Sequence, residues 1–365
     1  MVTAAIRHKP VTGSADRLSS PLVRVMLIDD SLTVRTVFSR MIERENDMTI
    51  VATASTAERG LEDLQTKYVD VILLDLEMPG MGGIEALPKL LAASPRTKVL
   101  VISSLTAEGA EHTVQALRTG AADTMLKPLP GGFNDAYRDQ LLGKIRALKG
   151  FDTESPPRRH QPKFAQRSVG KRPLALAIGA STGGIHALGL FLRQVPENFD
   201  LPILITQHLP ASFIPVFAKQ MEMASGRHAI LADEGVEITR RSIVIAPGHG
   251  HMVVRSKGTK IVTGLAFNAV KSGCTPSVDP MFETCAEAYD GKIAGILLSG
   301  MGRDGTEGAD AIIRAGGSVY AQSAESCAVW GMPRDITERG LASAVLPPAE
   351  LADRVLATAG ADAWR

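Results

Sequence analysis

The sequence predicts an α/β protein made of two doubly wound parallel-sheet domains. Short apolar runs rich in β-branched residues alternate with segments of helical spacing in both halves of the chain. Such alternation is typical of a parallel sheet that is covered by helices on both faces. The chain has 365 residues, which exceeds the ~250–300 residues at which a single core stops growing. We therefore expect one such sheet in each half.

Five apolar runs in the first half predict five strands with helices between them. The segment after the first run carries apolar residues at helical spacing, from Val34 through Phe38 to Ile42. The five runs, in chain order, are VRVMLIDD, TIVATAS, VDVILLDLEM, TKVLVISS and DTMLKP.

The same alternation returns in the second half, together with one segment of a different pattern. Residues 251–266, HMVVRSKGTKIVTGLA, alternate with a period of two about a Lys-Gly turn, which predicts a β-hairpin inserted between the parallel units. The strand-like runs here are LALAIGAS, LPILITQHL, RSIVIAPG, KIAGILLSGMG and GSVYAQS.

Composition shifts divide the chain into four parts. Residues 1–21 are polar and lack the apolar stretch of a secretory signal, so they predict a disordered lead-in. Residues 22–145 form the first domain. Residues 146–172 contain two adjacent prolines, few apolar residues and a cluster of Arg and Lys, which predicts a linker. Residues 173–365 form the second domain.

Composition also excludes several classes of protein. The formal net charge of +1 gives no electrostatic reason to expect a nucleic-acid partner. No apolar run reaches the ~18 residues of a membrane span, so we expect no direct membrane insertion. The three cysteines form no close pair, which favours a reducing compartment and hence a cytoplasmic location.

Acidic, hydroxyl and basic side chains follow the strands predicted in the first half. The carboxyl ends of parallel strands meet at one edge of a sheet. Three carboxylates gathered there would repel one another unless a hard cation such as Mg²⁺ lay between them. One of them, bound beside the cation, can attack phosphorus, while a lysine and a serine hold the phosphoryl oxygens. The residues are Asp29, Asp30, Asp75, Ser103 and Lys127.

Each of these residues alone could be a helix cap or an ordinary loop residue, but together they form a recognisable set. The motifs DDS, LDLEMPGMGG, ISS and KP resemble the flavodoxin-like receiver domain of response regulators, over about residues 22–145. The resemblance implies that Asp75 accepts a phosphoryl group from a histidine kinase, with Asp29, Asp30 and Asp75 around Mg²⁺ and Ser103 and Lys127 at the phosphoryl group. Gly82 stands where many receivers carry Asp.

The stretch LAIGASTGG, residues 176–184, is open to two interpretations. A dinucleotide-binding turn requires G-x-G-x-x-G, and Ser181 occupies the place of the second glycine, where a side chain would intrude on a pyrophosphate. The pattern G-x-S-x-G fits better, because it is typical of a sharp strand-to-helix turn that exposes a serine nucleophile. Backbone N–H groups of Thr182 and Gly183, with the loop of Met301, would then bind an oxyanion.

A serine nucleophile needs a base and an acid that orients the base. His208 is the histidine that ends an apolar strand, which predicts a position beside Ser181. Asp304 follows the run KIAGILLSGMG, in a loop whose glycines allow close approach to other loops. For His249 and His251, which lie in a Gly-rich turn without further ligand residues, we expect a structural role.

These residues follow a receiver-like domain, and that combination carries a second resemblance. GASTGG, QHLP, PSVDPMF and SGMGRDG resemble the Rossmann-like catalytic domain of chemotaxis-type protein-glutamate methylesterases, over about residues 172–360. The resemblance implies hydrolysis of glutamyl γ-methyl esters on methyl-accepting chemoreceptors and deamidation of receptor glutamines, switched on by phosphorylation of Asp75. It implies Ser181 as nucleophile, His208 as base and Asp304 as orienting acid, without a cofactor for the ester reaction. Thr275 stands where related proteins often have a basic residue.

Three other functions remain alternatives. A phosphorylation-switched binding protein could dock on a receptor without catalysis, but docking alone needs none of Ser181, His208 and Asp304. A nucleotide-dependent oxidoreductase is opposed by Ser181 in the glycine-rich turn. A DNA-binding output domain is opposed by the strand–helix alternation of the second half.

Overall fold

The structure is a computed structural model that describes residues 22–104, 106–128, 132–150 and 170–360. The lead-in predicted for residues 1–21 and most of the linker predicted for 146–172 lie outside the described residues. We call residues 22–150 the N-terminal domain and residues 170–360 the C-terminal domain.

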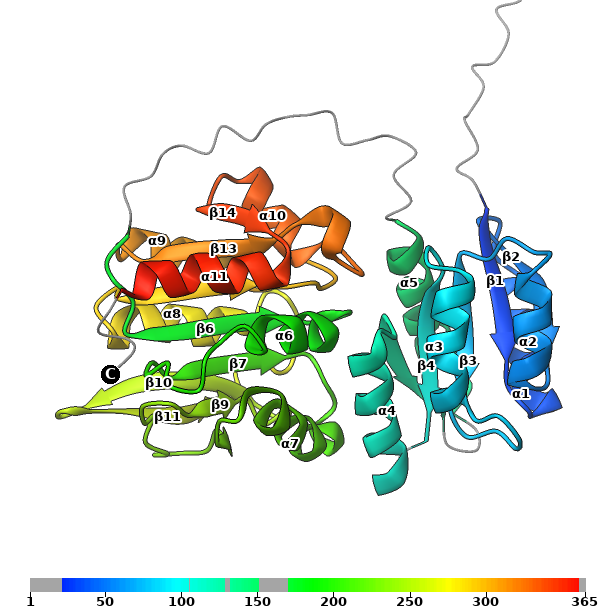
Figure 1. Cartoon of the computed structure of the whole chain (residues 1–365), viewed down its shortest axis with the longest axis horizontal. Coiled ribbons are helices and arrows are strands. Elements are labelled where there is room, and N and C mark those ends of the chain that lie inside the picture. Colours follow the sequence, from blue (N-terminus) through cyan, green and yellow to red (C-terminus); the bar gives the residue numbers. More distant parts are fainter. Residues whose placement is uncertain (1–21, 105, 129–131, 151–169, 361–365) are drawn as a thin grey trace, which may run out of the picture.

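The N-terminal domain is a five-stranded parallel sheet in the order β2-β1-β3-β4-β5, with helices on both sides (Figure 1). All five strands predicted from the sequence are present. The strands are β1 (Val23–Ile28), β2 (Met48–Ala54), β3 (Val71–Asp75), β4 (Lys98–Ser103) and β5 (Asp123–Leu126). The helices are α1 (Leu32–Ile42), α2 (Ala57–Leu64), α3 (Gly83–Ala93), α4 (Ala107–Thr119) and α5 (Asp135–Lys149).

The C-terminal domain is a seven-stranded parallel sheet in the order β14-β13-β12-β6-β7-β9-β8. Its strands are β6 (Ala175–Ala180), β7 (Ile203–Gln207), β8 (Ala229–Leu231), β9 (Ile243–Ile245), β12 (Ile293–Leu297), β13 (Ser318–Gln322) and β14 (Ala344–Leu346). Its helices are α6 (Gly184–Leu192), the short η1 (Ala211–Phe213), α7 (Ile214–Ser225), α8 (Val278–Ala288), α9 (Thr306–Arg314), the short η2 (Ala324–Ser326), α10 (Met332–Glu338) and α11 (Pro348–Ala359).

The inserted hairpin is also present and packs beside this sheet. Strands β10 (His251–Lys257) and β11 (Lys260–Ala266) pair antiparallel around a tight turn at Gly258, whose φ of 63° suits glycine. The predicted fold class is therefore confirmed. Strands β8 and β14 were not predicted. Each has three residues of which only one is β-branched, whereas the equally short β9 is β-branched throughout.

Side-chain caps and apolar burial explain why these segments fold as they do. Four helices of the N-terminal domain begin after a residue whose side chain accepts a hydrogen bond from the first turn, namely Ser31, Thr56, Thr106 and Asn134. The central strands β3, β6 and β7 are buried along their whole length, as expected for parallel strands covered on both faces.

The two domains pack against each other along α4. This helix contacts α6, α7 and η1 of the C-terminal domain, as Figure 1 shows for the teal and green helices. Val114 of α4 and Phe217 of α7 belong to one continuous cluster of buried apolar residues. The N-terminal domain therefore lies close to the start of α6, where the sequence places Ser181.

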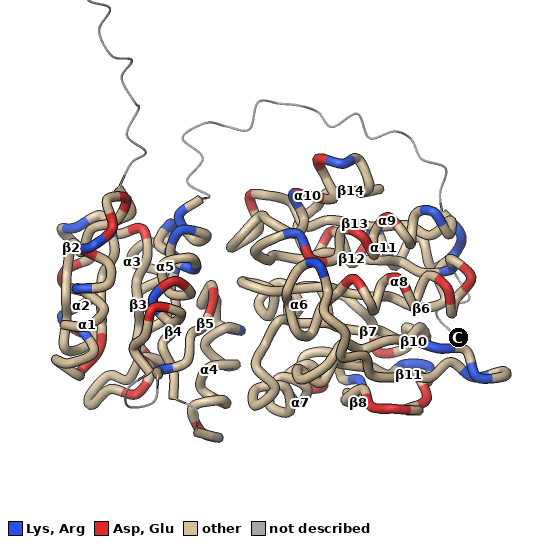
Figure 2. Tube along the Cα trace, turned by 180° about the vertical axis from the view of Figure 1, so that it is seen from behind, with Lys and Arg blue, Asp and Glu red and all other residues tan. Residues whose placement is uncertain are grey.

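Residues of both charge signs occur throughout the part of the chain that the structure describes. Basic and acidic residues are mixed over both domains (Figure 2). None of the helices built from described residues combines the length and apolar character that crossing a bilayer requires.

Candidate functional site

The sheet order brings Ser181 and His208 to neighbouring strand ends. Strands β6 and β7 pair in parallel, with Ala180 opposite Gln207. The next residues along the chain are Ser181 and His208, respectively, so these two residues follow neighbouring strand ends. The backbone N–H of His208 donates to the carbonyl of Ala180 at 3.0 Å, which holds the two strand ends together. Strand β12 lies on the other side of β6, and the loop that follows it carries Asp304.

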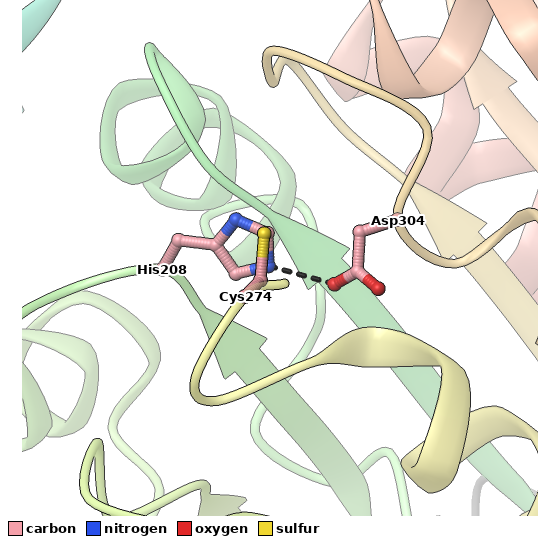
Figure 3. Close-up of side chains that lie close together, drawn as sticks. All are labelled: His208, Cys274 and Asp304. Atoms are coloured by element: carbon pink, nitrogen blue, oxygen red, sulfur yellow. Dashed lines mark hydrogen bonds and ion pairs between the residues drawn. The ribbon is translucent and has the colours of Figure 1, made fainter. Parts of the chain in front are cut away.

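Asp304 reaches across the end of β6 to His208. The distance between Nε2 of His208 and Oδ2 of Asp304 is 2.8 Å, a hydrogen bond shown dashed in Figure 3. Because Nε2 is bound to this carboxylate, Nδ1 is the ring nitrogen left to act on a serine. The hydroxyl of Ser181 makes no hydrogen bond to another described residue.

Two groups at the start of α8 fix the carboxylate of Asp304. The hydroxyl of Ser277 donates to Oδ1 at 2.6 Å, and the backbone N–H of Val278 donates to Oδ2 at 2.7 Å. Burial by itself would raise the pKa of Asp304, but His208 and these two donors outweigh it and hold the pKa at about 2. Asp304 is therefore a buried, ionised acceptor beside His208.

The pKa of His208 is shifted in the opposite direction. Burial of the imidazole lowers the pKa, but the carboxylate of Asp304 and the thiol of Cys274 favour the charged ring and raise the pKa to about 9. Such a shift is the expected effect of a carboxylate that orients an imidazole. The pair can therefore stabilise an imidazolium after proton uptake.

The turn after β6 is crowded, and glycines make the crowding possible. Gly183 has a φ of 76°, and a Cβ there would lie 2.4 Å from Cβ of Ala328. A Cβ on Gly300 would lie 2.9 Å from Cβ of Ser181. The backbone N–H groups of Thr182 and Gly183 donate no hydrogen bond to another described residue. They precede α6, and free N–H groups at that place can bind an anion.

A second set of predicted residues meets at the carboxyl edge of the N-terminal sheet. Ligand atoms of Asp29, Asp30 and Asp75 all lie within 4.8 Å of one another. Nζ of Lys127 lies 2.5 Å from Oδ2 of Asp75 and 3.7 Å from Oδ2 of Asp29. Ser103 ends the strand next to that of Asp75 and is buried.

The acidic cluster has the properties of a site for a divalent cation. Oδ2 of Asp29 and Oγ of Ser103 are buried and have no hydrogen-bond partner among the described residues. Burial and the charge of Asp75 raise the pKa of Asp29 to about 6, although Lys127 opposes the shift. Burial also raises the pKa of Asp75. A bound cation would relieve this repulsion, and carboxylate oxygens are the ligands that Mg²⁺ prefers.

Several residues near Ser181 were not predicted. Ser277 holds Asp304, and the ring of His251 accepts a hydrogen bond from the N–H of Ser277 at 3.0 Å, so His251 has the structural environment expected for it. Cys274 lies beside His208 and Asp304 (Figure 3). The hydroxyl of Thr182 donates to Oδ2 of Asp123 in the N-terminal domain at 2.6 Å. Only the folded loops bring these residues together.

Comparisons with known proteins give the same division of the chain. A family model described as CheB methylesterase matches residues 176–355, and a model described as response regulator receiver domain matches residues 25–132. Three relatives that span almost the whole chain are described as protein-glutamate methylesterase/protein-glutamine glutaminase. They come from Azospirillum brasilense (36% identical, covering 90% of this chain and 91% of the relative), Paramagnetospirillum magneticum (38%, 92% and 95%) and Caulobacter vibrioides (39%, 89% and 95%).

Proposed function

The chain belongs to the family of CheB-type protein-glutamate methylesterases and glutaminases with an N-terminal receiver domain, and on this premise we propose that Ser181, His208 and Asp304 carry out its hydrolysis. The enzyme acts in chemotactic adaptation, and its receiver domain regulates it. The observation that carries the proposal is the 2.8 Å hydrogen bond between His208 and Asp304, formed at the end of the strand next to that of Ser181.

The proposed reaction is acyl transfer. Oγ of Ser181 attacks the γ-carbonyl carbon of a glutamyl methyl ester while Nδ1 of His208 accepts the hydroxyl proton. The tetrahedral oxyanion accepts hydrogen bonds from the N–H groups of Thr182 and Gly183, with the Met301 loop alongside. The proton then passes from His208 to the leaving methoxide, and methanol departs.

Water completes the cycle. It gives a proton to His208 and attacks the acyl-serine. His208 then passes this proton to Oγ of Ser181 as the acyl–oxygen bond breaks, which releases glutamate and restores both residues. A glutamine side chain follows the same path with ammonia as the leaving group. Asp304 stays ionised throughout and stabilises the imidazolium.

The proposed partners follow from the two domains. Methyl-accepting chemoreceptors are the substrates, and a histidine kinase phosphorylates Asp75. Mg²⁺ held by Asp29, Asp30 and Asp75 would supply the positive charge that phosphoryl transfer to Asp75 requires, with Ser103 and Lys127 at the phosphoryl oxygens. Three free cysteines support a reducing, cytoplasmic location.

Regulation is proposed to act on the turn of Ser181. The unmodified receiver holds Thr182 through the hydrogen bond that the Thr182 hydroxyl donates to Asp123. It also packs against Val329, in a cluster of buried apolar residues. The neighbouring residue Ala328 lies against Gly183 in the turn. A change in the receiver on phosphorylation would weaken these contacts and open the turn to substrate. Coupling of ~1–3 kcal/mol is enough to change activity ~5–150-fold.

The proposal can be tested by measuring the rate at which the protein releases methanol from a methyl-labelled chemoreceptor fragment. We expect the Ser181→Ala variant to be slower by about 10⁴–10⁶-fold, because removing the nucleophile disables the whole triad. The exposed residue Ser256, on the hairpin strand β10 of the same domain, offers a matched Ser→Ala control that should keep its activity. Turnover by Ser181→Ala close to that of the parent protein would rule out this nucleophile, and binding without methanol release would favour a docking protein.

A further inference from the structure

A thiol completes a group of three potential metal ligands at the proposed catalytic centre. Ligand atoms of His208, Cys274 and Asp304 lie within 4.8 Å of one another, and Figure 3 shows the sulfur of Cys274 beside the His208 ring. Thiolate, imidazole and carboxylate are the ligands that Zn²⁺ takes in proteins. We propose that these three side chains form an inhibitory site for one zinc ion. The ion takes the place of the proton in the hydrogen bond between Nε2 of His208 and Oδ2 of Asp304.

The distances suit a tetrahedral ion after a small adjustment. Zinc bonds of ~2.0–2.3 Å place neighbouring ligand atoms about 3.3–3.6 Å apart. Nε2 of His208 and Oδ2 of Asp304 are 2.8 Å apart, so a metal between them requires a separation of about half an ångström. Cys274 lies in the loop before α8 and is partly exposed, so its side chain can approach the ion without disturbing the core.

The surroundings of the cluster also favour an ion. Ser277 and Val278 hold the Asp304 carboxylate from behind, which is how ligand carboxylates are oriented around metals. A cavity of about 450 Å³ is lined by Cys274, Met301 and Asp304 and gives a hydrated ion a path to the site. The fourth position of the ion would be open to water from this cavity, as in zinc sites with three protein ligands.

Ligand type separates this site from the acidic cluster of the receiver. Asp29, Asp30 and Asp75 offer only hard oxygen atoms, which suit Mg²⁺, whereas Cys274 adds a soft sulfur. On binding, the Cys274 thiol and Nε2 of the charged His208 ring each give a proton to solvent. The neutral ring keeps its proton on Nδ1 and binds the ion through the Nε2 lone pair. Asp304 then no longer orients the imidazole as a base, so bound zinc and ester hydrolysis exclude each other.

Spectroscopy with Co²⁺ as the probe tests the site directly. The full chain is titrated with Co²⁺ in excess Mg²⁺, which occupies the receiver cluster. We expect one equivalent of Co²⁺ to produce the near-ultraviolet charge-transfer band of a cobalt–thiolate bond. Cys274→Ser should abolish the band, whereas Cys327→Ala, which changes a buried thiol away from the site, should keep it. A missing band, or one that persists in Cys274→Ser, would overturn the proposal.

Inhibition by Zn²⁺ supplies the functional readout. Methanol release by each protein is measured against its own metal-free rate, with a chelator as the reversal step. We expect the inhibitory zinc concentration to rise by at least about ten-fold in Cys274→Ser and to stay unchanged in Cys327→Ala. Equal inhibition of both variants would mean that zinc acts elsewhere. Ser181→Ala should still give the cobalt band, so the metal site can be judged even if the proposed nucleophile is wrong.

Discussion

The hydroxyl of Thr182 donates a 2.6 Å hydrogen bond to the carboxylate of Asp123, and this bond ties the turn of the proposed nucleophile to the receiver domain. Thr182 directly follows Ser181, and its backbone N–H is one of the proposed oxyanion donors. Asp123 begins β5 and is held in turn by Nζ of Lys144 at 2.5 Å. Asp123 is thus a fixed carboxylate of the receiver that holds the turn of the proposed nucleophile.

Removing that carboxylate should raise the activity of the unphosphorylated enzyme. In Asp123→Ala, Thr182 loses its partner across the interface, and the resting state that holds the turn is destabilised by about 1–1.5 kcal/mol. We expect methanol release from the receptor substrate to increase by about five- to ten-fold.

Glu85→Ala provides the control, because Glu85 is exposed on α3 and forms its ion pair with Lys89 of the same helix. This variant should keep the resting activity. If Asp123→Ala were no more active than Glu85→Ala, the hydrogen bond to Thr182 would not contribute to inhibition.

The strand ends in the sequence were sufficient to predict where Ser181, His208 and Asp304 lie, because parallel strands deliver their following residues to one edge of a sheet. The contacts around them could not be predicted in this way. Ser277 reaches Asp304 only because the chain after β11 folds back against His251. The bond from Thr182 to Asp123 depends on how two domains pack, and no local pattern encodes that packing.

The pH dependence of hydrolysis should report the pair of His208 and Asp304. As the proposed base, His208 accepts the serine proton only when it is neutral, and its pKa is raised to about 9 because Asp304 and Cys274 outweigh the effect of burial. We therefore expect kcat/KM to rise with pH through the neutral range and to level off above about pH 9.

Asp304→Asn should lower the midpoint of this pH profile, because the negative charge that stabilises the imidazolium is removed. The midpoint should move toward the ordinary histidine value of about 6.5, and the rate should fall by about 10³–10⁴-fold. Ser181→Ala, measured at each pH with a chelator present, gives the background of spontaneous ester hydrolysis. An unchanged midpoint in Asp304→Asn would assign the titration to another group.

Ser277 is expected to act as a positioning residue. Its buried hydroxyl donates to Asp304 at 2.6 Å, so Ser277→Ala leaves one carboxylate oxygen without its donor. We expect kcat to fall by about ten-fold with little change in KM, because the lost contact lies behind the triad and away from the substrate. The midpoint of the pH profile should change as well, since the Asp304 carboxylate is held less firmly.

The control for this prediction is Ser256→Ala, which changes an exposed serine on the hairpin strand β10. Thermal melting of both variants separates a general loss of stability from a loss of positioning. A fall in kcat that only matched a loss of folded protein, with the pH profile unchanged, would assign Ser277 a purely structural role.

Binding of Mg²⁺ should stabilise the receiver through its acidic cluster. Asp29, Asp30 and Asp75 lie close together, and their mutual repulsion costs free energy that a divalent cation would relieve. At ten times its dissociation constant, Mg²⁺ should add about 1.4 kcal/mol to the free energy of unfolding of the domain that binds it, and a chelator should reverse the gain.

Asp30→Asn keeps the size of the side chain but removes one ligand charge, so the same gain in stability should need a higher Mg²⁺ concentration. Asp139→Asn on α5 changes an exposed carboxylate outside the cluster and should respond like the parent protein. Equal Mg²⁺ titrations of the two variants would show that the stabilising cation binds elsewhere, because only Asp30 belongs to the cluster.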